Sequence, residues 1–214
     1  MYPTRAGLRT GLVLLAAVAV PLGCVGSDAP SSARLTPEAE AAAVSLGGEA
    51  AAELSSTLVQ RLRAAIEEDG AAGAVGFCSE EGLALTAAVG EAVGAGIGRT
   101  SSRIRNPANA PDSLARVALA YFEETAASGE ALPPSLVQRT PSGDFRYYQP
   151  LLIQPFCLQC HGRASDLGEG VAAGLAERYP DDRATDYRAG DFRGLIHVTL
   201  PQRGVDAAIR GGRP

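Results

Sequence analysis

The chain of 214 residues contains no lysine and no tryptophan, and Met1 is its only methionine. Histidine occurs twice, as His161 and His197. Because methionine and histidine are common ligands of iron, these absences leave few side chains that could bind a metal. The formal net charge is −5, and all 19 basic residues are arginine. This acidic excess argues against nucleic acid as a partner, since binding to phosphates depends on clustered positive charge.

Long hydrophobic runs are also missing. The N-terminal apolar run, Gly11–Gly23, is too short for a transmembrane helix, which needs about 20 residues. It follows Arg5 and Arg9, a pattern that predicts a signal peptide over residues 1–23. The next residue, Cys24, gives the junction the look of a bacterial lipoprotein signal, in which that cysteine carries lipid; an ordinary signal peptide is the alternative. We therefore expect an exported protein on the periplasmic side, anchored in the membrane as a lipoprotein.

The chain length allows one domain or at most two. Residues 24–36 comprise the lipidated cysteine and a polar segment of small residues, which is typical of a flexible tether. We assign residues 37–214 to a single domain. Its composition, with 46% hydrophobic and 20% charged residues over the whole chain, is that of a protein with a folded core.

Hydrophobic periodicity predicts helices in the first part of this domain. Thr36 and Pro37 form a helix start, and leucine and isoleucine then recur every four residues until the helix is expected to end near Gly70. A second helical segment is expected over residues 72–88, and a third from Pro111 to Gly129.

Two later segments, Phe145–Ile153 and Leu195–Leu200, have the composition of β-strands. Helices therefore come early and strands late. This order favours an α+β fold over alternating βαβ units.

The motif with the strongest chemical content is Cys157-Leu158-Gln159-Cys160-His161, which has the form C-x-x-C-H. Two thiols at this spacing can each form a thioether with one vinyl group of a haem, and the adjacent histidine can then ligate the iron. The predicted export of the chain supplies the compartment in which such attachment takes place. We expect one covalent haem c.

Three other interpretations of the motif are weaker. A redox-active C-x-x-C favours a thioredoxin-like βαβ setting, which the predicted elements do not provide. A zinc site would use Cys78, Cys157, Cys160 and His161, but structural zinc sites usually have a second close pair of ligands. A structural disulfide is the third alternative.

The second axial position of the iron has few candidates: Cys78, His197, a tyrosine, or no protein ligand. If Cys24 carries lipid and the motif cysteines carry haem, Cys78 is the one remaining thiol, and it lies in an apolar helical stretch. His197 alternates with Ile196 and Val198 along a strand, so it should point away from an aliphatic core face. We favour Cys78 and keep His197 as the alternative.

Four blocks in order carry a resemblance to a known family. They are Ala74–Cys78, then Gly98–Ser101 followed by Arg105–Asp112, then Phe145–Leu151 running into Cys157–Gly162, and last Tyr187–Gly194 with the closing strand. Together they resemble a bacterial family of exported c-type proteins with a single haem and a PAS-like fold. The resemblance covers about residues 50–205. It implies a PAS-like antiparallel sheet flanked by N-terminal helices. It also implies Cys/His axial ligation, which falls here on Cys78 and His161.

The second block places Arg103 and Arg105 close to Asn106 and Asn109 in a loop punctuated by proline. A haem carries two propionates, and arginine is the natural bidentate partner of a carboxylate. These residues could therefore hold the propionates. Equally, the asparagines could cap turns while the arginines are solvated.

The sequence leaves two classes of function open. One is a redox or small-ligand sensor, which would need a separate signalling partner. The other is an electron-transfer carrier, which would need a redox partner protein. We do not expect an enzyme, because His161 is committed to iron and acid–base residues for an open distal site are scarce.

Overall fold

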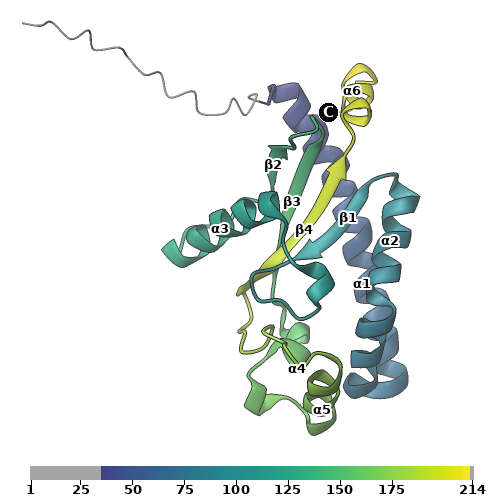
Figure 1. Cartoon of the computed structure of the whole chain (residues 1–214), viewed down its shortest axis with the longest axis vertical. Helices are drawn as coiled ribbons and strands as arrows, with labels where there is room; N and C mark the ends of the chain where they lie inside the picture. Colours follow the sequence, from purple (N-terminus) through teal and green to yellow (C-terminus); the bar gives the residue numbers. More distant parts are fainter. Residues whose placement is uncertain (1–34, 213–214) are drawn as a thin grey trace, which may run out of the picture. The chain divides into compact units, whose positions relative to one another are not determined.

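The computed structural model describes residues 35–212 (Figure 1). The predicted signal peptide over residues 1–23, the predicted lipidation site Cys24 and nearly all of the tether lie outside the described residues. Among the residues described, no helix has both the length and the apolarity needed to cross a bilayer.

The first helix, α1 (Pro37–Glu80), begins as the sequence predicts. The Thr36 hydroxyl accepts a hydrogen bond from the Ala39 amide at 3.2 Å, and Pro37 occupies the first turn. At Gly70 the backbone leaves helical geometry, with φ 71° and ψ 176°, a conformation that is essentially restricted to glycine. Gly70 therefore divides α1 into two arms, residues 37–69 and 71–80.

The expected second helix over residues 72–88 is wrong in its span. The second arm of α1 ends at Glu80, and a new helix, α2 (Gly82–Val93), starts after Glu81. An ion pair between Arg61 and Glu81, at 3.3 Å, shows that the second arm returns alongside the first. Periodicity did not reveal the boundary at Glu81, because α2 starts directly after the residue that ends α1.

The four strands are β1 (Gly96–Thr100), β2 (Leu136–Arg139), β3 (Phe145–Leu152) and β4 (Phe192–Leu200). They form one antiparallel sheet in the order β1-β4-β3-β2. The expected α+β class, with an antiparallel sheet flanked by N-terminal helices, is confirmed. β3 and β4 match the predicted strands, whereas β1 and β2 are short and were not predicted.

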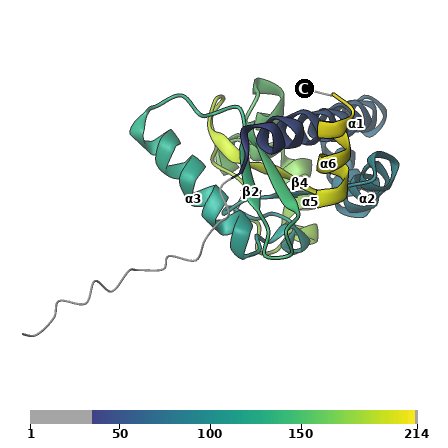
Figure 2. The same cartoon turned by 90° about the horizontal axis from the view of Figure 1, so that it is seen from above.

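Helices cover both faces of the sheet (Figure 2). On one face, Ile196, Val198 and Leu200 of β4 pack against the first arm of α1, where Leu54 is completely buried. A side chain at Gly47 would collide with the Tyr147 ring, which shows how closely α1 approaches the sheet.

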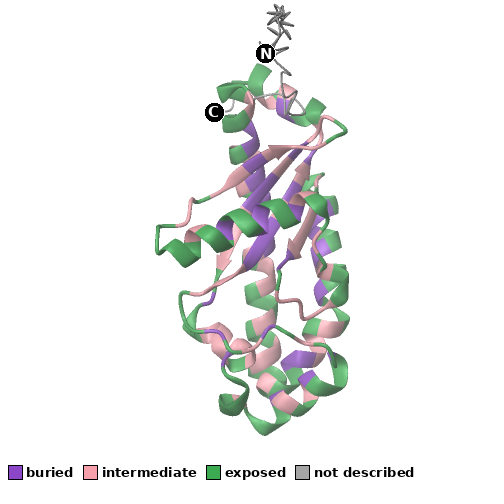
Figure 3. Ribbon diagram, turned by 60° about the vertical axis from the view of Figure 1, so that its left-hand side comes forward, coloured by how far each residue is buried: buried purple, intermediate pink, exposed green. Residues whose placement is uncertain are grey.

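The other face of the sheet is covered by α3 (Ser113–Ser128), whose predicted bounds are confirmed. Asp112 caps this helix and Gly129 ends it in a left-handed conformation. Leu119 and Phe122 of α3 pack against Leu195 of β4. Buried residues accordingly concentrate along the strands and the helix faces that meet them (Figure 3).

The remaining elements are short and lie in the connections between the strands and longer helices, or after β4. These are η1 (Pro107–Asn109), η2 (Pro155–Cys157), α4 (Leu158–His161), η3 (Ala164–Asp166), α5 (Glu169–Arg178) and α6 (Gln202–Arg210). Of these, α4 and α5 lie near the end of α1 where its two arms meet (Figure 1).

Leu54→Ala tests the packing of α1 on the sheet. Removing a completely buried leucine leaves a cavity, so we expect the free energy of unfolding to fall by about 2–5 kcal/mol. Urea unfolding followed by circular dichroism measures the change. Val59→Ala on the same helix is the control: Val59 is 42% exposed, and its truncation should cost no more than about 0.5 kcal/mol. Equal losses in both variants would contradict this packing.

Candidate functional site

The C-x-x-C-H motif lies directly after β3, in η2 and α4. The helical turn places its two thiols in different apolar surroundings. Cys157 packs with Ile153 and Tyr187, while Cys160 packs with a cluster that includes Val75. Neither thiol is in a disulfide, and both are partly buried.

Both motif thiols line one cavity of about 120 Å³, which we call the apolar cavity. Its walls come from both arms of α1, from the motif and from α5. Its apolar lining residues are Leu62, Ile66, Val75, Phe156 and Leu175. Such a lining suits a flat hydrophobic group.

A second cavity of about 200 Å³, which we call the polar cavity, shares part of this wall. Cys78, Arg105, His161 and Tyr179 line both cavities. The remaining polar lining residues are Arg99, Thr100, Ser101, Asn106, Asn109 and Arg193. The two cavities therefore meet at the two residues that the sequence analysis proposed as axial ligands, Cys78 and His161.

The His161 ring is held by the backbone. Its Nδ1 lies 2.6 Å from the carbonyl oxygen of Ala184, which can only accept a hydrogen bond. Nδ1 must therefore carry the proton, and Nε2 keeps the lone pair that can bind a metal. Burial and the nearby Arg105 and Arg193 guanidiniums lower the pKa of His161 to about 3, so the ring is neutral.

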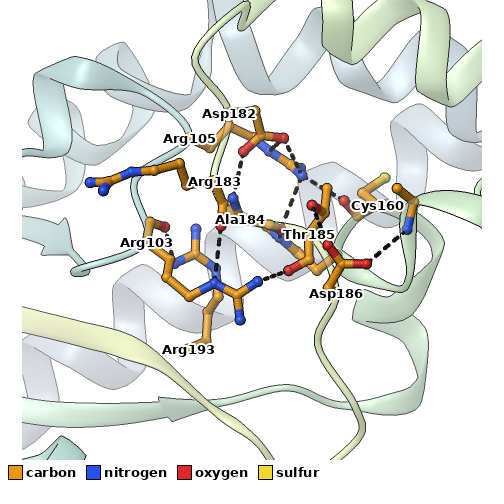
Figure 4. A network of polar contacts seen from close by, with 11 residues as sticks. Arg103, Arg105, Cys160, Asp182, Arg183, Ala184, Thr185, Asp186 and Arg193 are labelled. Carbon is orange, nitrogen blue, oxygen red and sulfur yellow. Dashed lines mark hydrogen bonds and ion pairs between the residues drawn. The ribbon is translucent and has the colours of Figure 1, made fainter.

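The Ala184 carbonyl is positioned by a buried ion pair (Figure 4). Asp182 accepts a bond from the Arg105 side chain at 2.9 Å and another from the Ala184 amide at 2.7 Å. Arg105 also donates to the carbonyl oxygens of Ala184 and of Cys160, at 3.2 and 2.6 Å. One guanidinium thus connects the motif to the segment that holds His161.

Arg103 and Arg105 are therefore not solvated arginines. Arg103 donates to the carbonyl oxygens of Arg183 and Thr185, and its guanidinium lies 4.0 Å from the centre of the Tyr187 ring. Arg103 does not line either cavity that contains His161.

The two asparagines of the same loop both line the polar cavity. The Asn106 side chain accepts a bond from the Ala108 amide and caps η1, as the capping interpretation expected. The carbonyl of Asn109 accepts a bond from the Thr100 hydroxyl.

Cys78 lies on the second arm of α1, and its side chain is exposed. The cavities account for this exposure, since the thiol lines both of them. Surrounding protein raises the pKa of Cys78 by desolvation, and Arg99 and Arg105 act in the opposite direction by their positive charge.

His197 lies elsewhere. His197 pairs with Gly98 of the neighbouring strand β1. It lies on the same face of the sheet as Leu195, the face covered by α3, as strand alternation predicted. It lines neither the apolar nor the polar cavity. Within residues 35–212 its Nδ1 has no hydrogen-bond partner, and burial lowers its pKa to about 4.

The described residues contain no group of three or more His, Cys, Asp or Glu side chains arranged to hold a metal ion. The zinc site considered above, which would need four such donors to converge, therefore has no support in this part of the chain. Three possible iron donors, Cys78, His161 and Tyr179, line both cavities, and a small number of donors suits axial ligation of one iron better than a closed tetrahedral site.

Sequence reasoning missed two arginines of the polar cavity, Arg99 and Arg193. Arg99 lies near the end of β1 and Arg193 near the start of β4, at the end of the sheet where β3 leads into the motif. Arg99 pairs with Ile196 of β4, so its side chain lies on the same face of the sheet as Ile196. This placement could not be inferred from the sequence, because β1 itself was not predicted.

Comparisons with known proteins identify the family of this chain. The sequence model of the Tll0287-like family matches residues 35–201. The crystal structure of the cyanobacterial haem protein Tll0287 is similar to this chain at 29% sequence identity, covering 58% of this chain and 71% of that protein, with a TM-score of 0.48. No curated protein matches the chain significantly.

The burial of His197 gives a prediction about pH. Its pKa in the folded protein, about 4, lies below the value of about 6.5 expected in the unfolded chain, so the unfolded state binds the proton first. The free energy of unfolding should therefore fall as the pH is lowered from about 6.5 to about 4, by at most about 1.4 kcal/mol per pH unit from this residue. Urea unfolding at several pH values measures the slope.

His197→Gln is the matched variant, because glutamine stays neutral over this range. The slope should be smaller in the variant than in the wild type, while Asp112 and Arg146, which also act on His197, are unchanged. Identical slopes would show that His197 has the same pKa in the folded protein as in the unfolded chain.

Proposed function

Because the chain belongs to the Tll0287-like family, we propose that it is an exported protein that binds one covalent c-type haem and acts as a redox or small-ligand sensor. The protein that gives the family its name is described as a cyanobacterial haem protein. The observation that carries the proposal is the meeting of the C-x-x-C-H motif, Cys78 and two adjoining cavities at one place.

The residues present fit a covalent haem. Cys157 and Cys160 offer two thiols for thioether bonds at the wall of the apolar cavity, and neither is committed to a disulfide. His161 offers an unprotonated Nε2, because its Nδ1 proton is donated to Ala184. When bound, a c-type haem supplies a redox-active iron with two axial positions.

Cys78 is the proposed second axial ligand. It lines both cavities together with His161, whereas His197 lies on the α3 side of the sheet and lines neither. A thiolate is a good ligand for ferric iron, and ligation would offset the desolvation that raises the pKa of the free thiol.

The proposed thiolate ligand supports the sensor over the electron-transfer carrier. A thiolate can be displaced on reduction or by a small ligand such as NO or CO, and Cys78 lies on the short second arm of α1, outside the core on the sheet. A carrier needs no such displacement, because its axial ligands stay in place. The sensor would also need a separate signalling partner, while a carrier would need a redox partner protein.

Export and anchoring are part of the proposal and rest on residues 1–24. The signal peptide over residues 1–23 would direct the chain to the periplasmic side, where haem attachment takes place. Cys24 would then hold the domain at the membrane through its lipid.

Haem attachment predicts a mass change. After expression with the haem-attachment machinery, the processed chain should be heavier than its polypeptide by one haem, and the haem should remain after extraction with acidified acetone. The double variant Cys157→Ala/Cys160→Ala should lose this mass, whereas Cys78→Ala should keep it. The same spectrum reports lipid on Cys24. A wild-type chain without haem would overturn the proposed function.

The axial ligand predicts a spectroscopic change. Cys78→Ser should abolish the low-spin thiolate signal in the electron paramagnetic resonance spectrum and raise the midpoint potential, because an anionic ligand that favours ferric iron is lost. His197→Gln should leave both unchanged. The reverse pattern would assign the iron to His197. Binding of CO by the reduced wild-type protein would support the sensor, and a reduced form inert to CO would favour the carrier.

A further inference from the structure

The polar cavity carries positive charge without a matching negative charge. Three arginines line it, Arg99, Arg105 and Arg193, and no aspartate or glutamate does. Of the three, only Arg105 has an acidic partner among residues 35–212, namely Asp182. The excess charge of this cavity therefore comes from Arg99 and Arg193.

Arg99 is held in place but not neutralised. One of its terminal nitrogens lies 3.5 Å from the Gly82 carbonyl oxygen, and its buried Nε has no hydrogen-bond partner in the described part of the chain. Burial lowers its pKa. A buried donor of a charged group that lacks a partner costs free energy, so such an arrangement indicates a missing anionic ligand.

Arg193 is in a similar position. It donates to the Arg103 carbonyl oxygen at 3.1 Å, and its guanidinium lies 5.5 Å from the centre of the Tyr187 ring. These contacts orient the side chain without supplying a negative charge. Desolvation again lowers its pKa.

The place of the two arginines agrees with the shape of a haem. The thiols that would hold the vinyl groups line the apolar cavity, whereas Arg99 and Arg193 line the polar cavity and not the apolar one, and Cys78 and His161 line both. A porphyrin of this type carries its vinyl groups and its two carboxylates toward opposite edges. An apolar cavity with thiols next to a cationic one matches this polarity.

We propose that the polar cavity is a carboxylate-binding site in which Arg99 and Arg193 are the direct partners of the haem carboxylates. The proposal rests on the proposed function. Guanidinium groups suit this role because they bind carboxylates through two parallel hydrogen bonds. Arg105 has a different role, since Asp182 and two backbone carbonyls already occupy its donors.

The test uses the full chain with haem attached, as wild type, Arg99→Gln and Arg193→Gln. Resonance Raman spectroscopy detects the bending mode of the haem carboxylates, whose frequency falls when hydrogen bonds to them are lost. Each variant should lower this frequency. The control is Arg61→Gln, because Arg61 is exposed and paired with Glu81 outside both cavities, and it should leave the frequency unchanged.

A second experiment distinguishes binding of a free carboxylate from binding of the haem's own carboxylates. Acetate is titrated at constant ionic strength, and thermal unfolding is followed. If the haem carboxylates fill the site, acetate should have no specific effect on the wild type. Saturable stabilisation of the wild type that is lost in Arg99→Gln would overturn the assignment to the haem and identify a free carboxylate as the ligand.

The proposal is overturned entirely if neither arginine variant shifts the Raman band and acetate has no effect. Failure of the proposed function is recognised separately, because a wild-type chain without haem gives no Raman signal from a porphyrin. The acetate titration still reports on the polar cavity in that chain, because thermal unfolding can be measured without haem.

Discussion

The site depends on one hydrogen bond, between Nδ1 of His161 and the carbonyl oxygen of Ala184. It fixes the tautomer and the direction of the ring, and therefore which ring nitrogen could bind a metal. The bond is itself supported by Asp182, which holds the Ala184 amide, and by Arg105, which spans from Asp182 to the Cys160 carbonyl. The loop around Ala184, which has no regular secondary structure, is thereby tied to the motif.

This arrangement also explains why so many charges lie near an apolar cavity. Arg105 and Asp182 are both largely buried, with side-chain exposures of 12% and 10%. A buried ion pair contributes little net stability once desolvation is counted, but removing one partner leaves an uncompensated charge. Its contribution here is to geometry: the pair sets the distance between the motif and the segment around Ala184.

Local signals predicted the parts of the fold that local sequence determines. Thr36 and Pro37 began a helix, Gly70 interrupted it, and α3 ended at Gly129, because capping and glycine conformations act within a few residues. Strand alternation also put His197 on the correct side of β4. The short strands β1 and β2 were missed because each has too few residues for a clear pattern and depends on pairing with β4 or β3.

The site was predictable only in part, for the same reason. The C-x-x-C-H motif is contiguous and was found directly, and Cys78 was proposed as a ligand because the candidates are few. The contacts of Ala184 and Asp182 with His161 and Arg105 join segments far apart in the sequence, and no local pattern encodes them. Arg103 shows the limit clearly, since its neighbours suggested either a partner for a propionate or a solvated side chain, and its actual partners are the backbone carbonyls of residues 183 and 185.

The elbow at Gly70 has a consequence for how this protein could diverge. Cys78 is carried by an arm of ten residues that joins the long first arm of α1 through a single glycine conformation. The first arm packs on the sheet, and the second does not belong to that core. Changes in the elbow would therefore move the sulfur relative to His161 while leaving the sheet intact. The distance between the two proposed ligands thus depends on the separate cluster around Val75, Val171 and Leu175, and not on the core that α1 forms with the sheet.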